Sequence, residues 1–293
     1  MDRSVNNSIS EKPIARNLRM MLIPVLGHRG ILVGIVIISI ALLIAILAPH
    51  IAPYDPLEMG VGEYLVPPNR GHWFGTDHFG RDLVSRVIYG SRTTLMIGGM
   101  VVLITSFMGT LIGLLAGYFR ILDKLLMRFM DGLMAFPAIL LGVAIMAFLG
   151  SSLINIIVAL SVVYTPRTAR IIRSRVLKLR EVPFVIAVHA LGGSAPRIIL
   201  SHVLTNSLAP LIVQSTFIFG YAILAEAALS FLGVGAPPEV QSWGTILNEG
   251  RPFLYHAPWY TIFPGTAIMF VVMGLNLLGD GLRDLLDPRL RGI

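Results

Sequence analysis

The chain contains no cysteine among its 293 residues. This absence excludes a disulfide framework, a thiolate metal site and a cysteine nucleophile. Charged residues make up only 13% of the sequence, whereas soluble domains carry about 25%. The sequence also lacks the H-E-x-x-H and G-x-S-x-G motifs, so no convergent set of catalytic groups indicates an enzyme. Hydrophobic residues account for 55% of the chain, which indicates a surface that largely faces lipid.

Long uncharged runs predict six membrane spans. Ile31–Ala48 has 18 residues, just enough to cross the hydrocarbon layer as a helix, and Thr93–Phe119 is the second span. Gly132–Pro166 is too long for one crossing, and Gly150-Ser151-Ser152 near its middle is a turn signal. This run is therefore divided into a third span, which starts a few residues before Gly132, and a fourth. The fifth and sixth spans are Val203–Ala225 and Trp259–Gly279.

The basic residues predict the orientation of these spans. Six spans place 18 of the 23 Lys and Arg residues on one side of the membrane. The positive-inside rule then makes four segments cytoplasmic, namely 1–30, 120–128, 167–202 and 281–293. The predicted fold class is an all-α membrane protein with both termini cytoplasmic. Because the basic residues are spread over four segments that adjoin spans, the net charge of +7 indicates topology signals and lipid headgroup contacts, and no nucleic acid is expected as a partner.

The loop at 49–92 is expected to form a turn-rich cap over the outer mouth. Prolines and glycines in its first part rule out a long helix there. After Arg81 the pattern predicts a short amphipathic helix that places Leu83 and Val87 on lipid or on neighbouring spans. Gly75 to Asp82 has the spacing of a phosphate loop, but Arg81 replaces the required Lys and Asp82 the required Ser or Thr.

The outer loop also contains His72 and His78. Two loop histidines without an evident third ligand do not make a metal site, so no metal is expected. Ionisable residues inside the spans are few, with Asp131 near the inner end of the third span and Glu226 near the outer end of the fifth. No span has a charge at its centre, which counts against ion-coupled transport by this chain alone and against a channel with a charged filter.

Small residues and prolines mark packing and bending positions within the spans. Gly109, Gly113 and Gly117 repeat every four residues, a spacing that lets two helices approach closely. Packing within one subunit is favoured, and contact with a second subunit remains the alternative. Pro137 and Pro166 each remove a backbone donor and can bend a helix.

The stretch from Glu181 to Pro210 is too apolar and too helix-like to be a disordered loop. Phe184, Ala187, Val188 and Leu191 recur at helical spacing. Gly192-Gly193 ends this helix, and Pro196 can begin a second one. A short helix with an exposed apolar face fits a groove on a partner protein. A cytoplasmic ATPase at this position would supply the energy that the chain lacks, and an interfacial helix resting on lipid is the alternative.

This loop resembles the signature loop of binding-protein-dependent ABC importer permeases, E-A-A-x3-G-x9-I-x-L-P. The chain retains Ala187, Gly192 and Leu204 of that pattern. It departs from it at Ile186, Val188, His202 and Thr205. Longer segments within 75–292 are similar to the dipeptide, oligopeptide and nickel branch of this family. These segments are GTDHFGRDLVSRVIYGSRTTL, LMAFPAILL, ALGGSAPRIILSHVLTNSLAPLIV, AEAALSFLGVGAPPEVQSWGTILNEGR and NLLGDGLRDLLDPRLRG.

The resemblance implies the permease architecture of type I ABC importers and the second permease subunit of such a system. Implied partners are a homologous permease, two ATP-binding subunits and an extracytoplasmic solute-binding protein, in a bacterial inner membrane. ATP and Mg would be carried by the partner subunits, and no cofactor by this chain. The solute would be a di- or oligopeptide, with nickel or another small solute as one alternative and a non-transporting membrane scaffold as another. The implied ATPase-coupling residues are Ala187, Ala190, Leu191, Gly192, Gly193, Ser194 and Arg197.

Four regions follow from this interpretation. Residues 1–30 form a cytoplasmic tail, and 31–92 contain the first span and the outer loop. Residues 93–280 form a core of five spans with a coupling loop at 167–205, and 281–293 form a second cytoplasmic tail. The segments that could contact a solute-binding protein are 71–92 and 236–256.

Overall fold

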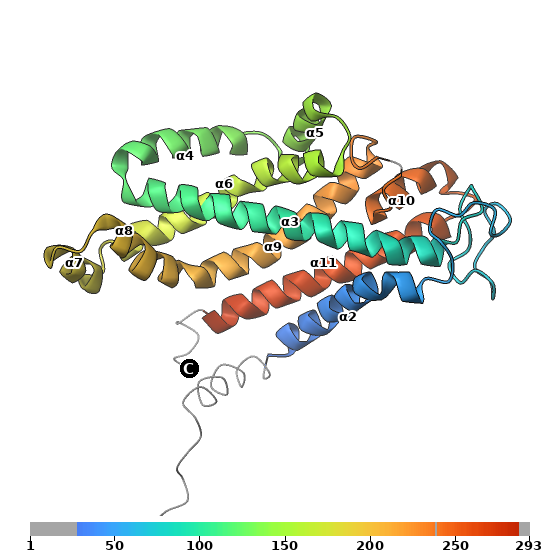
Figure 1. Ribbon diagram of the computed structural model, residues 1–293, viewed down its shortest axis with the longest axis horizontal. Coiled ribbons are helices and arrows are strands. Elements are labelled where there is room, and N and C mark those ends of the chain that lie inside the picture. The colour runs from blue at the N-terminus through green and yellow to red at the C-terminus, as the bar shows by residue number, and fades with distance from the viewer. Residues whose placement is uncertain (1–27, 238, 287–293) are drawn as a thin grey trace, which may run out of the picture.

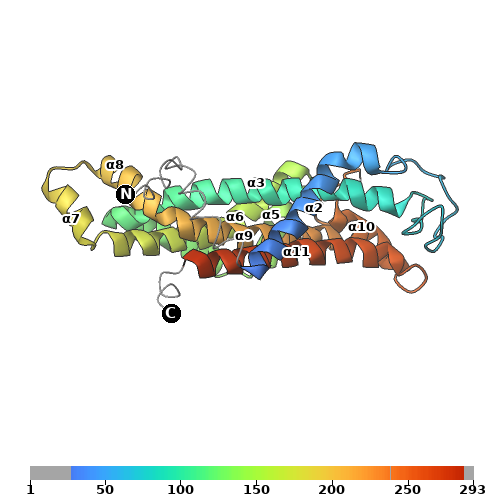
Figure 2. The ribbon, with the colours of Figure 1, turned by 90° about the horizontal axis from the view of Figure 1, so that it is seen from below.

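The computed structural model describes residues 28–237 and 239–286. These residues form an elongated bundle of helices that run roughly side by side along one long axis (Figures 1 and 2). The described residues contain no strand, only one isolated bridge between Thr76 and Asp82. The helices are α2 (Arg29–Ile51), α3 (Leu83–Tyr118), α4 (Arg120–Met134), α5 (Ala138–Leu149), α6 (Leu153–Leu179), α7 (Pro183–Ala190), α8 (Ala195–Arg197), a π-helical segment (Ile198–Leu204), α9 (Thr205–Phe231), α10 (Trp243–Gly250), a 3-10 turn (Arg251–Phe253) and α11 (Trp259–Leu286).

The longest of these helices, α3, corrects the expected boundary of the second span. It starts at Leu83, directly after Asp82, whose carboxylate accepts the backbone N–H of Ser85 at 2.8 Å. An acidic N-cap of this kind satisfies a free amide at the helix start. The expected separate amphipathic helix is therefore wrong, because 36 residues form one uninterrupted helix. Leu83 and Val87 belong to its buried first turns and pack on neighbouring helices.

The expected third span is broken. Taken together, α4 and α5 are long and apolar enough to cross a membrane, but the two helices meet at an angle of 95°. Pro137 stands at this break, where it precedes α5 and cannot donate a backbone hydrogen bond. α4 is amphipathic, with Met127 and Met130 buried against its neighbours.

The expected turn at Gly150–Ser152 is confirmed between α5 and α6. Ser152 caps α6 by accepting the N–H of Asn155 at 3.3 Å. α6 then runs through Pro166 to Leu179, well beyond the predicted end of the fourth span.

The three glycines spaced by four residues face α6 from α3. A Cβ atom at Gly109 would lie 2.5 Å from Cβ of Thr168, and one at Gly117 would lie 2.5 Å from Cβ of Val176. At Gly113 it would lie 2.6 Å from the carbonyl oxygen of Ala169. α3 and α6 therefore pack backbone to backbone at a distance that no larger residue allows.

Replacing Gly113 by leucine is expected to destabilise the fold by about 1–3 kcal/mol or more, because the added side chain has no space and the two helices must separate. The matched control is Gly99→Leu on the same helix, since a Cβ there meets no atom within 4 Å. Thermal unfolding in detergent should show a lower midpoint for Gly113→Leu than for Gly99→Leu. Equal midpoints would contradict the close α3–α6 packing.

Four helices among the described residues are long and apolar enough to cross a membrane, namely α2, α3, α9 with its preceding segment, and α11; α4 and α5 count as a fifth if the bent pair is one span. α9 reaches Phe231 and α11 reaches Leu286, beyond the predicted ends of the fifth and sixth spans. Of the two expected tails, most of 1–30 and the end of 281–293 lie outside the described residues.

Candidate functional site

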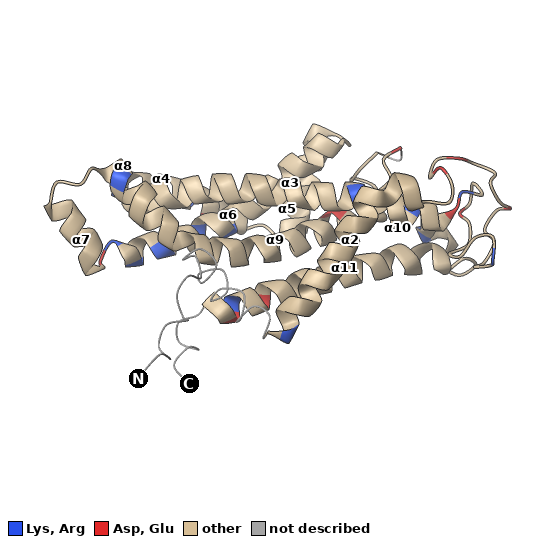
Figure 3. Cartoon of the chain, turned by 60° about the horizontal axis from the view of Figure 1, so that its bottom comes forward, with Lys and Arg blue, Asp and Glu red and all other residues tan. Residues whose placement is uncertain are grey.

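The two ends of the bundle differ in charge. In Figure 3, where the cartoon is coloured by residue type, Lys and Arg positions predominate near the end that carries α7 and α8, and acidic and basic positions are mixed at the opposite end, around α10 and the segment that precedes α3. The long middle of the bundle is nearly free of charge. The two ends are called the loop end and the cap end below.

At the loop end, α7 is a short helix with defined limits. Pro183 occupies its first turn, where a missing N–H costs nothing. Its far end closes on Gly192, which has φ of +85°, a conformation that favours glycine. The N–H of Gly193 donates to the carbonyl of Val188 at 2.9 Å, and this bond satisfies a carbonyl at the helix end. The chain therefore fixes where the helix stops and where α8 begins, with Pro196 in its first turn.

Only one side chain of α7 is fully buried. Val185 packs into a small core with Ile172, Val176, Ile198 and Val203 from α6 and the π-helical segment. The face predicted from helical spacing is wrong at one of its four positions, because Val188 turns partly inward beside Val185. The other three predicted positions, Phe184, Ala187 and Leu191, are exposed.

The exposed side of this loop is strongly apolar. Leu191 is 88% exposed and Ile186 is 54% exposed. Large apolar side chains at this level of exposure mark an interaction surface when they gather on one element. Of the residues expected to couple to a partner, most are exposed and Gly193 is half-buried; the exposed ones are Ala187, Ala190, Leu191, Gly192, Ser194 and Arg197.

Basic residues of α6 tie the loop end to α3 and α4. Arg173 donates two hydrogen bonds to the carboxylate of Asp123, at 2.5 and 2.7 Å. Arg180 donates to the carbonyls of Gly117 and Tyr118, at 3.0 and 3.1 Å, at the end of α3. The sequence interpretation treated these arginines as topology signals and lipid headgroup contacts. In the structure they also hold the helices from which the α7 loop projects.

At the cap end, four charged side chains form a buried cluster. Asp77 and Arg86 have side chains that are 0% exposed, and their contact is 2.6 Å long. Arg86 also donates to Glu249 at 2.9 Å, and Arg81 pairs with both Asp77 and Glu249. The charges balance as two acids and two bases, so each buried charge has a partner of opposite sign.

Neutral groups complete the cluster. The hydroxyl of Tyr260 on α11 accepts from Arg86 at 3.0 Å and donates to Glu249 at 2.9 Å. Nε of Arg86 donates to Gln241 at 2.8 Å. These bonds join the segment before α3 to α10 and α11, which lie more than 150 residues later in the chain.

The segment before α3 is folded around Asp77. Its carboxylate accepts the N–H groups of Phe79 and Arg81, at 2.7 and 2.9 Å. Gly75 and Gly80 both have positive φ values, and they let the chain turn sharply. The spacing that resembles a phosphate loop therefore forms an acid-centred turn.

The two histidines of this region have separate partners. His72 contacts Asp82 at 2.9 Å, and Nδ1 of His78 lies 3.1 Å from the Tyr260 hydroxyl. Burial lowers the pKa of His78 below its ordinary 6.5, which favours the neutral ring. In the part of the chain that the structure describes, no group of three His, Asp or Glu side chains could hold a metal ion.

The ionisation of Glu249 makes the stability of the cluster depend on pH. Burial acts to raise its pKa, but the charges of Arg86 and Arg81 and their hydrogen bonds hold the pKa below the ordinary 4.5. A lowered pKa in the folded state means that the stabilisation is complete above pH 4.5 and is lost as the pH falls through the lower folded value. The unfolding midpoint should therefore fall on acidification below pH 4.5, and this fall should be smaller in Glu249→Gln. Equal losses in both proteins would contradict the ion-paired Glu249.

Sequence reasoning missed this cluster. Arg81 was judged only as a failed phosphate-loop lysine, while Asp77, Arg86 and Glu249 were not singled out. The signal that could have revealed it is the scarcity of charged residues. Only 13% of the chain is charged, yet two arginines lie beside an apolar run. Such residues are usually paired when they are buried.

The fold and its two ends define a helical membrane protein with an uncharged middle and several candidate spans. Residues 109–292 match the model of the family described as binding-protein-dependent transport system inner membrane component. This match covers more than half of the chain, so the chain belongs to that family. Residues 19–68 match the N-terminal transmembrane domain of oligopeptide transport permease C.

Curated relatives are similar over nearly the whole chain. The dipeptide transport system permease protein DppC of Alkalihalophilus pseudofirmus is 47% identical over 261 residues, which cover 89% of this chain and 86% of the relative. The protein of the same name from Haemophilus influenzae is 40% identical, covering 90% and 92%. The di/tripeptide transport system permease protein DppC of Pseudomonas aeruginosa is 41% identical, covering 90% and 89%.

Proposed function

We propose that this chain is one of two homologous permease subunits in an ATP-driven importer of di- and oligopeptides. The peptide assignment is supported by the names of relatives that are 40–47% identical over about nine-tenths of the chain. Two ATP-binding subunits, which carry ATP and Mg, and an extracytoplasmic solute-binding protein complete the complex. The chain itself binds no cofactor and performs no chemistry.

The proposed membrane arrangement has six spans. α2, α3, α6, α9 and α11 each cross once, and the bent pair of α4 and α5 forms the remaining crossing. Both termini then lie in the cytoplasm of a bacterium, with the loop end on the same side. The concentration of Lys and Arg positions at that end supports this orientation.

The observation that carries the coupling role is the exposed apolar side of α7. Its buried anchor, Val185, fixes the helix to α6 and the π-helical segment, while Leu191 projects into open space. A rigid helix with an apolar tip suits a groove on another protein. When the ATP-binding subunits close, they would pull on this helix. Because α6 and α9 adjoin it, the pull would reach the spans and drive alternating access.

The opposite end would receive the solute-binding protein. Of the two candidate segments, 71–92 is largely buried, apart from Trp73 near its start. The segment at 236–256 presents Tyr255, which is 97% exposed, and Leu254, which is 45% exposed. Exposed aromatic side chains are enriched at protein interfaces, so 236–256 is the proposed contact.

The absence of cysteine allows a direct test. In the assembled complex, Leu191→Cys should form a cross-link to an ATP-binding subunit with a short reagent that carries a maleimide at one end and a photoreactive diazirine at the other. Tyr255→Cys is the matched control, because it is similarly exposed at the opposite end. A cross-link from residue 255 to an ATP-binding subunit, or none from residue 191, would contradict the proposed docking site.

A further inference from the structure

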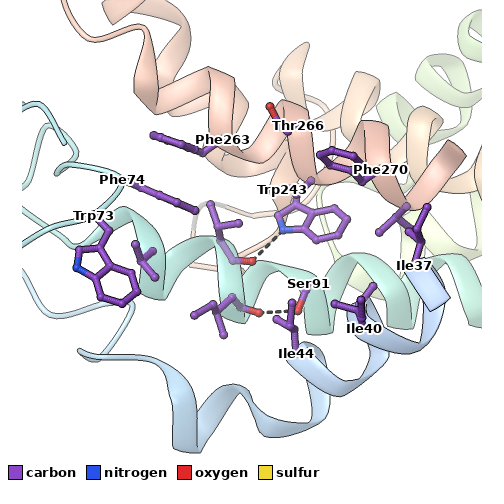
Figure 4. A pocket seen from close by; sticks show the side chains of 16 residues that line it. Ile37, Ile40, Ile44, Trp73, Phe74, Ser91, Trp243, Phe263, Thr266 and Phe270 are labelled. Atoms are coloured by element: carbon purple, nitrogen blue, oxygen red, sulfur yellow. Dashed lines mark hydrogen bonds between the residues drawn. The ribbon is translucent and has the colours of Figure 1, made fainter. Parts of the chain in front are cut away.

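An apolar slot of about 560 Å³ lies between α2, α3 and α11 near the cap end. Figure 4 shows its lining, with Ile37, Ile40 and Ile44 of α2 on one side and Phe263 and Phe270 of α11 on the other. The volume falls in the range of roughly 300–1,000 Å³ that is usual for small-molecule sites. No charged side chain lines the slot among the residues that the structure describes.

Two glycines mark where α2 and α11 touch beside the slot. A Cβ atom at Gly34 would lie 2.6 Å from the carbonyl oxygen of Gly274, so the two helices meet there backbone to backbone. A Cβ atom at Gly274 would lie 2.9 Å from Cβ of Ile37, so the close contact reaches the first residue of α2 that lines the slot. The slot lies along the next turns of α2, and Trp243 and the first turns of α3 line its other side.

The polar side chains within the slot have already used their hydrogen-bond donors. The hydroxyl of Ser91 donates to the carbonyl of Ile88 at 2.6 Å, and that of Thr266 donates to Ile262 at 2.6 Å. The indole N–H of Trp243 donates to Val87 at 2.9 Å. A peptide would bury backbone carbonyl groups here without side-chain donors, which is costly. A hydrocarbon chain has no such groups.

The slot is continuous with the surface that faces bilayer lipid. Its rim includes Ile40 and Phe270, which are 52% and 48% exposed on the outward faces of two candidate membrane spans. It runs along α2 from Ile37 to Ile44, about 10 Å at the helical rise, in the direction that acyl chains take in a bilayer. Trp73, 73% exposed, stands at its mouth, and tryptophan is enriched at the membrane–water interface.

We infer that this slot binds one acyl chain of a membrane phospholipid. The lipid would wedge α2 apart from α11 next to the cap end. The exposed Arg70, three residues before Trp73 in the chain, supplies positive charge that complements the phosphate of the headgroup. This inference concerns a lipid site and does not depend on which solute is transported.

Photo-labelling of the assembled complex tests the inference. The complex is placed in vesicles of phosphatidylethanolamine and phosphatidylglycerol that contain a phosphatidylglycerol with a diazirine in the middle of one acyl chain. After illumination, mass spectrometry should locate adducts on the slot-lining parts of α2, α3 and α11. Adducts confined to outward-facing residues such as Leu43 and Ile46 would overturn the inference. That result is also expected if a segment of the second permease, rather than a lipid, fills the slot.

A pair of variants sharpens the result. Ala267→Phe places a ring inside the slot and should lower labelling of its lining about tenfold, equivalent to losing the burial of roughly two methylene groups. Ile262→Phe adds an aromatic ring on the same helix outside the slot and should leave labelling unchanged. Equal labelling in both variants would overturn the inference. If Ala267→Phe does not fold, the adduct map of the unmodified complex decides the question alone.

Discussion

Replacing Arg86 by methionine is expected to destabilise the protein by about 3–5 kcal/mol, the usual effect of removing one partner from a buried ion pair. The substitution leaves Asp77, whose side chain is 0% exposed, paired only with Arg81, and it leaves Tyr260 without its guanidinium donor. Tryptophan fluorescence, to which Trp243 and Trp259 beside this region contribute, offers a signal for thermal unfolding in detergent. The midpoint should fall steeply.

Arg92→Met on the same helix is the control, because Arg92 is exposed and has no ion pair among the described contacts. It should lower the midpoint little. Adding Asp77→Asn to Arg86→Met should recover part of the loss, since the uncompensated negative charge is then removed. If Arg86→Met and Arg92→Met unfold at the same temperature, the cluster does not hold the cap end together.

Replacing Leu191 by aspartate is expected to reduce peptide-stimulated ATP hydrolysis by the assembled complex about tenfold or more. An apolar anchor in the centre of an interface contributes about 2 kcal/mol or more to binding, and each 1.4 kcal/mol corresponds to about tenfold in affinity. The side chain is 88% exposed in the isolated chain, so the permease itself should fold normally. Hydrolysis is measured in lipid with the loaded solute-binding protein present.

Position 191 is a better site for this test than its neighbour. Gly192 has φ of +85°, so any substitution there strains the backbone and mixes that effect with the effect of charge. Leu191→Met is the matched control, because it keeps the position apolar and should retain stimulation. Full stimulation in Leu191→Asp, with the ATP-binding subunits still attached, would exclude α7 as the coupling element.

Local signals in the sequence predicted much of the loop end. The glycine pair at 192–193 and the proline at 196 act through the backbone of their own segment, so their effects follow from sequence alone. The inward turn of Val188 did not follow. Every position of α7 but one is apolar, so periodicity could not tell which side packs on α6.

The cap end was harder to predict because its partners are distant in the chain. Arg86 and Glu249 are 163 residues apart, and only the folded bundle brings them together. The break at Pro137 had a local signal, yet its 95° angle depends on how α4 packs through Met127 and Met130. The overall helical class could be predicted from the long uncharged runs, because a segment in lipid must satisfy its backbone hydrogen bonds internally, as a helix does.

Uptake of a labelled dipeptide into proteoliposomes tests the central claim most directly. The vesicles contain this chain, its partner permease and the two ATP-binding subunits, with the solute-binding protein on the side of the dipeptide. The account predicts uptake that requires ATP at the ATP-binding subunits and stops when they are omitted. Dipeptide uptake of equal rate by the two permeases alone would contradict the account.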